Sequence, residues 1–396
     1  MLAQAISLMA VLLLARLYSP TDFGVSAVFL SISNIVQAFA TLRLDWSVPN
    51  TRTRVQAGVL MAIGFIAVAA ISAFIFFLIA IGGNWLPLLQ EVQYLGKWIF
   101  LLPVVILGVG LHQLLHSWFV READLTAVSG VKITQSVVGV VTGVMGGVGK
   151  LGAIGLVASA AVSAWVGIAR LVRHADGLLA ALKRITPRRI SAGWIRFKKE
   201  AILSSLVSLV NVASLSVTPL LLAKFYKAAD VGAYALMLRI AVAPVGVITG
   251  AVSQSFWAEA ANIIKIDKLR LKELYVRSTR RLAMVAVPVA VVAASGPLYV
   301  GQLFGEEWTS SGYVLASLAP YLLGQIVVSP LSHLIVHKKQ HWQLAWDVSR
   351  LLMVATALVW LGWSGTNIYW TVLAASLVQL GMYVIIFFLN FRCLSK

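Results

Sequence analysis

Acidic residues and cysteines are scarce in this chain of 396 residues. Aspartate and glutamate number 14 against 32 lysines and arginines, and charged residues of both signs make up only 12% of the sequence. The single cysteine, Cys393, excludes an internal disulfide. With 60% apolar residues, the chain is too apolar to cover itself with a polar, water-exposed surface. We therefore expect a protein whose solvent is lipid.

Long apolar runs indicate the structure that the chain adopts in a bilayer. Backbone polar groups find no partners in lipid, so spanning segments are helices or a closed barrel. The runs lack strict alternation, and most reach the roughly 18–25 residues that a helix needs to cross. We predict an all-α polytopic membrane protein of about twelve transmembrane helices, over Leu2–Ala15, Gly24–Leu44, Val55–Ile81, Ile99–Val120, Val131–Val148, Ala153–Leu171, Ala201–Ala223, Val231–Ala251, Leu282–Phe304, Gly312–Val336, Leu344–Trp363 and Ile368–Phe391.

Positive charge gathers in alternate loops. A net charge of +18 could indicate a nucleic-acid partner, so the position of the charge decides its meaning. With the N-terminus in the cytoplasm, most basic residues fall in inward-facing loops, and the outward-facing set is Arg16, Lys97, Lys150, Lys224 and Lys227. The charge therefore indicates topology, with both termini cytoplasmic, and no nucleic-acid partner is expected. The first run is short, which indicates that part of its helix lies upstream of Met1, and no cleavable signal is expected.

The chain repeats itself. Ala15–Gly24 and Ala223–Gly232 share an alanine, a basic residue, a tyrosine, an aspartate and a glycine at constant spacing. Each repeat would hold six helices, and an even number gives both halves the same orientation, related by a pseudo-two-fold axis along the membrane normal. We predict an N-terminal six-helix half at residues 1–171, a basic cytoplasmic linker at 172–200 and a C-terminal six-helix half at 201–396.

The sequence of two basic segments is compatible with two structures. Leu178–Arg184 and Ile264–Arg281 mix basic and apolar residues. Each could form an amphipathic helix on the cytoplasmic leaflet or a solvated loop that sets orientation.

Several segments carry a family resemblance. Ala15–Gly24, followed by Thr41–Asp45, resembles the opening of Wzx-type polysaccharide flippases. The stretch from Gly232 to Phe256 is similar to the matching part of their second half, and Ser329–Ser332 leading to Gln340 is similar to their tenth helix and its exit.

The resemblance implies the larger superfamily that also holds multidrug exporters and peptidoglycan-precursor flippases. It implies a flippase, with no catalytic step and no cofactor, that moves an undecaprenyl-pyrophosphate-linked oligosaccharide from the inner to the outer leaflet of the bacterial cytoplasmic (inner) membrane. It also implies membrane lipids, a polysaccharide polymerase and chain-length machinery as partners.

Two arginines are the main candidates for binding a diphosphate. Arg239 lies about nine residues into its run, roughly 13 Å from the outer end at 1.5 Å per residue. A charge at that depth needs water or a partner, and a guanidinium suits bidentate capture of phosphate. Arg239 could instead pair with helix-end carbonyls or pack the halves together. Arg43, at the inner end of its run, could receive the headgroup or reach to lipid phosphates.

Neutral polar residues supply further candidates. Asn211, Gln113, Gln135 and Gln254 could bond to sugar hydroxyls or between helices. His112, His116 and His333 could form a proton-sensitive lining or serve polar helix packing, and no metal site is expected because zincin and CxxC motifs are absent. Asp22 and Asp230 precede equivalent runs and are interpreted as helix N-caps.

The position of the acidic residues bears on the cargo. All fourteen fall in loops or near predicted helix ends, which favours an anionic cargo over a cationic drug. A multidrug or other small-molecule antiporter stays open as an alternative, as does a membrane-embedded glycosyltransferase or polymerase. No nucleotide-binding motif occurs, so ATP hydrolysis is not expected as the driving force.

Overall fold

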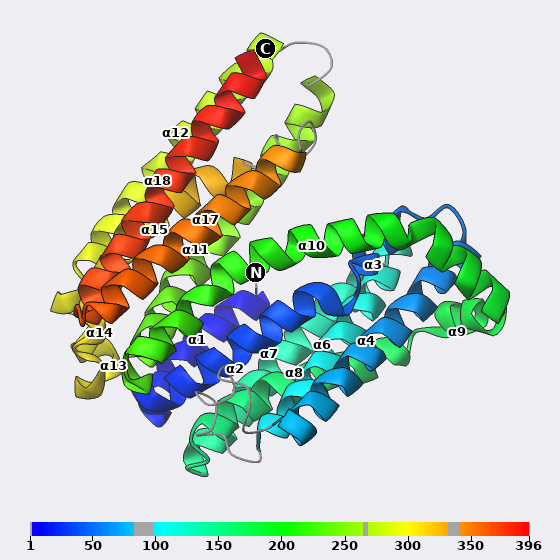
Figure 1. Ribbon diagram of the computed structural model, residues 1–396, viewed down its shortest axis with the longest axis horizontal. Helices are drawn as coiled ribbons and strands as arrows, with labels where there is room; N and C mark the ends of the chain where they lie inside the picture. The colour runs from blue at the N-terminus through cyan, green and yellow to red at the C-terminus, as the bar shows by residue number, and fades with distance from the viewer. Residues whose placement is uncertain (1, 83–97, 264–267, 332–339, 396) are drawn as a thin grey trace. The chain divides into compact units, whose positions relative to one another are not determined.

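The computed structural model describes residues 2–82, 98–263, 268–331 and 340–395, which form helices joined by short turns (Figure 1). The longer helices are α1 (Leu2–Leu17), α2 (Pro20–Ala40), α4 (Arg54–Gly82), α6 (Leu101–Arg121), α7 (Leu125–Val148), α8 (Ala153–Val172), α10 (Pro187–Phe225), α11 (Ala228–Ile263), α12 (Lys268–Ala294), α15 (Ala319–Val328), α17 (Gln340–Trp363) and α18 (Ile368–Ser395). Shorter ones are α3 (Leu44–Ser47), η1 (Val48–Asn50), α9 (Asp176–Lys183), η3 (Gly296–Leu298), α13 (Val300–Phe304), η4 (Glu306–Trp308), α14 (Ser311–Ser317) and η5 (Ser329–Leu331).

Each predicted run overlaps at least one helix in the described ranges. Eight helices in the described ranges are long and apolar enough to cross a membrane. Glu306–Ser317 and Ala319–Leu331, bent by 50°, form a ninth candidate span and match the tenth run. The remaining runs are α1, α11 and α12. The predicted all-α polytopic fold is confirmed, and the chain is a multi-pass membrane protein.

Several helix boundaries were predicted wrongly. α10 begins at Pro187 rather than Ala201 and is 39 residues long, so much of the predicted linker is helical. α12 spans Lys268–Ala294 rather than Leu282–Phe304, because Gly296 and Pro297 follow it and start η3. Hydrophobicity detects only the part of a helix that lies in lipid, so polar extensions of the same helix were read as loops.

The two basic segments are helical over most of their described residues. In α9, Leu178 and Ala181 are buried, and Ala181 lies against Gly58 of α4. Of the two alternatives for this segment, the structure therefore has the helix, and part of its apolar face packs on the protein. Within Ile264–Arg281, the described part forms the start of α12, and residues 264–267 lie outside the described residues.

The chain divides into two compact units. The unit called N-terminal here contains Leu2–Tyr18 and Val25–Ser216, and the C-terminal unit contains Ser19–Gly24 and Val217–Lys396. The boundary crosses α2 and α10, so the first turn of α2 packs with the C-terminal unit. The division into residues 1–171, 172–200 and 201–396 stays a prediction.

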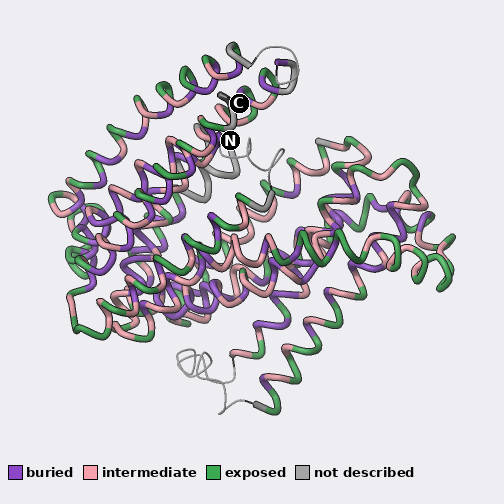
Figure 2. The backbone as a smooth tube through the Cα atoms, turned by 45° about the horizontal axis from the view of Figure 1, so that its top comes forward, coloured by how far each residue is buried: buried purple, intermediate pink, exposed green. Residues whose placement is uncertain are grey.

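Each unit is built from long helices with one packed and one open side. In the N-terminal unit α8 packs on both α6 and α7, and in the C-terminal unit α15 packs on both α12 and α18. Buried and exposed residues alternate along most helices (Figure 2). A Cβ on Gly146 of α7 would lie 2.7 Å from the Cα of Gly155 in α8, so glycines allow these two helices to approach closely.

The repeated segment makes a reciprocal contact within the C-terminal unit. A Cβ on Gly24 would lie 1.8 Å from the carbonyl oxygen of Ala228, and a Cβ on Gly232 would lie 1.8 Å from that of Pro20. Gly24 is equivalent to Gly232 in the repeat, and Pro20 to Ala228. Because each member contacts the counterpart of the residue that contacts it, the arrangement has the form of a two-fold axis.

We expect Gly24→Ala and Gly232→Ala each to lower the midpoint of thermal unfolding of the purified protein. The added methyl meets backbone that has no flexible end to give way, and overpacking of this kind costs about 1–3 kcal/mol. The control is Gly381→Ala in α18, where a Cβ meets nothing within 4 Å. A midpoint that stays at the wild-type value in both test variants would contradict the close backbone contact.

Candidate functional site

A cavity of about 570 Å³ lies in the N-terminal unit, between the turn after α2 and helices α6 and α7. Arg43, Gln113, His112 and His116, all predicted from the sequence, line it together. The rest of its polar and aromatic lining comes from Asp45, Trp46, Ser117, Lys132 and Gln135.

The turn that carries Arg43 has an unusual backbone. Leu42 and Arg43 both have positive φ, 51° and 53°, a left-handed conformation that is uncommon outside glycine and recurs at functional sites. The Thr41 hydroxyl donates to Asp45 Oδ1 at 2.6 Å and closes the turn. The Arg43 guanidinium carbon lies 4.3 Å from the centre of the Trp46 ring. The turn and the indole together hold the guanidinium at the cavity.

An ion-pair network stabilises the end of the α2–α4 segment that leads into α4. Arg54 Nη2 and Arg121 Nη1 each lie 2.5 Å from an oxygen of Glu122. Arg121 Nε also donates to Thr51 Oγ1 at 2.9 Å. These contacts join the end of α6 to the start of α4. The segment between α2 and α4, which includes Arg43, is therefore held at both ends.

The two histidines offer unused hydrogen-bond positions. His112 and His116 lie one turn apart in α6 with ring centroids 6.0 Å apart. Their Nε2 atoms are buried and have no hydrogen-bond partner in the described part of the chain. A hydroxyl, a phosphate oxygen or water in the cavity would satisfy them.

Gly167 of α8 lies behind two of the side chains that line the cavity. A Cβ on Gly167 of α8 would lie 2.3 Å from Gln135 Nε2 and 2.9 Å from His112 Cδ2. Glycine at this position therefore lets α8 lie directly behind these two side chains and keeps them aimed at the cavity.

The charges of the cavity favour an anion. Arg43 and Lys132 are positive, and Asp45 alone is negative. Burial lowers the pKa of the Arg43 guanidinium, and the Asp45 carboxylate opposes that shift. A bound anion would, like Asp45, stabilise the charged guanidinium and offset its desolvation. In the described ranges, no group of three or more His, Cys, Asp or Glu side chains could hold a metal ion.

The other predicted binding residues lie elsewhere. Arg239 and Gln254 are exposed residues of α11 in the C-terminal unit. Asn211 is half-buried in α10, outside the cavity, and its carbonyl oxygen accepts from the Ser214 hydroxyl. His333 lies outside the described residues. Their assignment to substrate stays a prediction.

Asp22 and Asp230, predicted as N-caps, are instead each the third residue of a helix, α2 and α11. The Asp22 carboxylate accepts from the backbone N–H and the hydroxyl of Ser19 at 3.1 and 2.8 Å, and the Asp22 N–H donates to the Ser19 hydroxyl at 3.3 Å. Ser19 and Asp22 thus pair in the manner of a capping box at the start of α2. Asp230 lies at the same position in the first turn of α11.

The acidic residue Asp347, expected near a helix end, is buried within the protein. Asp347 lies inside α17, only 1% of its side chain is exposed, and its Oδ1 is 3.2 Å from Nη2 of the equally buried Arg350. Gln343 Nε2 donates to the other carboxylate oxygen at 3.2 Å. Arg350, one turn along the same helix, supplies the positive charge that makes this burial tolerable.

Sequence reasoning omitted part of the cavity. Asp45, Trp46 and Lys132 were not proposed as ligands, although Lys132 is a charged residue at the start of an apolar run. Gln135 was among the amides considered as partners of sugar hydroxyls, and it lines the cavity. A charged residue inside a predicted membrane span could have been identified as a candidate ligand from the sequence. The packing of α7 against α6, which brings Lys132 and Gln135 to Arg43, was not visible in the sequence.

Solved structures with a similar fold are membrane transporters and a flippase. An inward-facing multidrug resistance MATE family transporter of the MOP superfamily has a TM-score of 0.74 at 13% identity, covering 99% of this chain and 94% of that chain. Lipid II flippase MurJ in an inward closed conformation has a TM-score of 0.69 at 11% identity, covering 99% and 88%. A MOP superfamily transporter from Pyrococcus furiosus has a TM-score of 0.59 at 13% identity, covering 100% and 93%. The chain therefore has the fold of the MOP superfamily.

The family model described as polysaccharide biosynthesis protein matches residues 13–312. The chain belongs to that family, and the resemblance drawn from its sequence motifs is confirmed at this level. No curated protein is significantly similar to it in sequence.

We expect Arg350→Met alone to lower the thermal midpoint of the purified protein by several degrees. The change leaves the Asp347 carboxylate buried without its partner, which typically costs about 3–5 kcal/mol. The double variant Asp347→Leu with Arg350→Met removes both charges and should recover most of the loss. A single variant as stable as wild type would show that the pair is not buried as described.

Proposed function

We propose that the protein is a flippase that moves a polyprenyl-diphosphate-linked oligosaccharide across the bacterial inner membrane by alternating access. The observation that carries the proposal is the cavity of the N-terminal unit, where Arg43 and Lys132 lie among neutral hydrogen-bonding groups. Such a cargo presents a diphosphate, sugar hydroxyls and a long apolar tail, and the first two match the lining. The tail stays in lipid.

The cationic groups of the cavity suit a diphosphate. A guanidinium binds two phosphate oxygens at once, and an ammonium adds a mobile point charge. Neutral histidine nitrogens and the amides of Gln113 and Gln135 accept or donate to sugar hydroxyls without a net charge. The cavity binds its cargo without bond making or breaking, so the protein is a carrier and not an enzyme.

The family and the similar folds support the same proposal. The family is described by polysaccharide biosynthesis, and one solved structure of similar fold is a lipid II flippase. A saccharide carried on a lipid is compatible with both descriptions. The distribution of basic loops orients Arg43 toward the cytoplasm, where cargo loads from the inner leaflet, with both termini on that side. A polysaccharide polymerase and chain-length machinery are the partners that would take the product.

Arg239 is the proposed anion contact of the C-terminal unit. It is an exposed residue of α11, and an arginine deep in a spanning helix needs water, a partner or a ligand. A cargo passed between two units needs a cation on each, and Arg239 supplies it on the second.

The main alternative is export of small molecules, which the MATE transporter of similar fold favours. Two observations oppose a cationic drug as cargo. The N-terminal cavity is itself cationic, and the buried carboxylate of Asp347 already has Arg350 as its counterion.

We expect Arg43→Ala to slow flipping at least about tenfold, because a lost charge-assisted hydrogen bond is worth roughly 1.5–3 kcal/mol. The assay is translocation, in proteoliposomes containing the purified full chain, of undecaprenyl-diphosphate-linked oligosaccharide extracted from the source bacterium. Arg43→Lys keeps the charge but loses bidentate geometry, so its rate of flipping should lie between those of the wild type and Arg43→Ala. Arg188→Ala, an exposed position of α10, is the matched control. Wild-type flipping by Arg43→Ala would refute the role of the cavity.

Arg239→Ala should reduce flipping in the same assay, again with partial retention by Arg239→Lys. The control in the same unit is Arg277→Ala, an exposed position of α12. If Arg239→Ala and Arg277→Ala behave alike, Arg239 has no part in binding the cargo.

A further inference from the structure

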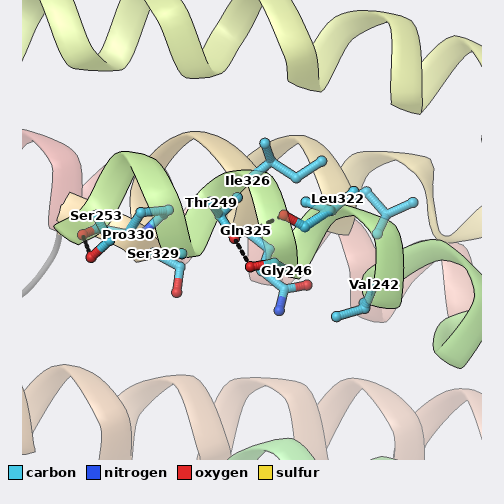
Figure 3. A pocket seen from close by; sticks show the side chains of 11 residues that line it. Val242, Gly246, Thr249, Ser253, Leu322, Gln325, Ile326, Ser329 and Pro330 are labelled. Atoms are coloured by element: carbon cyan, nitrogen blue, oxygen red, sulfur yellow. Dashed lines mark hydrogen bonds between the residues drawn. The ribbon is translucent and has the colours of Figure 1, made fainter. Parts of the chain in front are cut away.

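The C-terminal unit contains a second cavity, of about 250 Å³, between α11 and the α15–η5 segment (Figure 3). Its polar lining is Gly246, Thr249, Gly250 and Ser253 from α11, with Gln325 and Ser329 opposite, and valine, leucine and isoleucine side chains complete the wall. We infer that this trough binds one uncharged sugar ring of the cargo and gives the protein its saccharide selectivity. The inference rests on the proposed function and names the part of the cargo that the second unit recognises.

Two glycines keep the trough open. Gly246 and Gly250 lie one turn apart on the same face of α11. A Cβ on either would meet nothing within 4 Å, in contrast to Gly24 and Gly232, where it would collide with backbone. Glycine inside a helix costs about 1 kcal/mol relative to alanine, and no packing contact explains that cost here. The missing side chains leave space for a ligand.

The polar groups of the trough present acceptors and an unused amide. The Thr249 hydroxyl donates to the Val245 carbonyl at 3.0 Å, and the Ser253 hydroxyl donates to the Pro330 carbonyl at 3.0 Å. Both oxygens keep lone pairs that can accept from a ligand. The Gln325 amide has no hydrogen-bond partner among the described residues, and in Figure 3 it extends to the same side as the Ser329 hydroxyl. An amide can donate to one sugar hydroxyl and accept from another.

The lining selects among the parts of the cargo. No charged side chain lines the trough, so it offers no counterion to a diphosphate. A prenyl chain would desolvate the Gln325 amide without replacing its hydrogen bonds, which is costly. A cationic drug would find neither a carboxylate nor an aromatic ring. A sugar ring has apolar C–H faces and hydroxyl edges, and both match the alternation of apolar and polar groups.

The volume limits the ligand to a small unit. Pockets for drug-sized ligands are typically about 300–1,000 Å³, and the trough is smaller than that range. It therefore accommodates one ring of an oligosaccharide and not a whole repeat unit. The cationic groups that suit a diphosphate line the cavity of the N-terminal unit, so the two units would recognise different parts of one molecule.

The test is binding of three defined probes to the purified full chain in lipid nanodiscs. The probes are radiolabelled undecaprenyl diphosphate, the same carrier with one hexose, and the same carrier with one N-acetylhexosamine. We expect the wild-type chain to bind at least one glycosylated carrier about tenfold more tightly than the bare carrier. Gly246→Leu should abolish this difference and leave the Kd for the bare carrier unchanged.

Matched variants separate filling of the trough from misfolding. Gly381→Leu adds the same side chain at another open helical position of the same unit and should keep the difference. Gln325→Ala adds no bulk and should reduce the difference by removing the amide. Thermal midpoints of all variants show whether each is folded.

The outcomes separate this inference from the proposed function. Retention of the sugar-dependent difference in Gly246→Leu and Gln325→Ala would overturn the inference, as would a wild-type chain that binds all three probes equally. Failure of the wild-type chain to bind the bare carrier would overturn the proposed function itself, and the inference with it.

Discussion

A bilayer cannot solvate charge, and the placement of a few charged side chains follows from this constraint. Asp347 and Arg350 meet it by pairing with each other inside α17. Arg43 meets it at the rim of a cavity, with an indole on one side and a single carboxylate nearby. The first pair is buried among protein groups, with Gln343 and Trp346 beside it. The guanidinium of Arg43 faces space that an anion can enter, and this difference separates a structural charge from one that can bind cargo.

The cationic cavity of the N-terminal unit and the neutral trough of the C-terminal unit are formed in different ways. The cationic cavity depends on a left-handed turn, on the Glu122 network and on Gly167, which lets α8 pack behind the lining. The neutral trough depends on glycines at which an added Cβ would meet nothing within 4 Å. Glycine thus permits close packing at some positions and leaves empty space at others, and only the surroundings of each glycine distinguish the two.

Hydrophobicity was sufficient to predict the all-α polytopic fold, because each apolar run long enough to span a bilayer must satisfy its own backbone. It could not predict where α10 and α12 begin, since their basic first turns lie outside the apolar runs. Arg43, Gln113 and the histidine pair were found from residue type and helical spacing. Lys132 was missed because its approach to Arg43 depends on how α7 packs. The burial of Asp347 was not expected because it depends on Arg350 as a counterion.

The central claim is that an anionic headgroup occupies the cavity beside Arg43, and a density map of the full chain with bound undecaprenyl diphosphate tests it most directly. The account predicts diphosphate density within hydrogen-bonding distance of the Arg43 guanidinium and near Lys132, with the prenyl chain leaving toward lipid. Diphosphate density at another place, with the cavity holding only water, would contradict it.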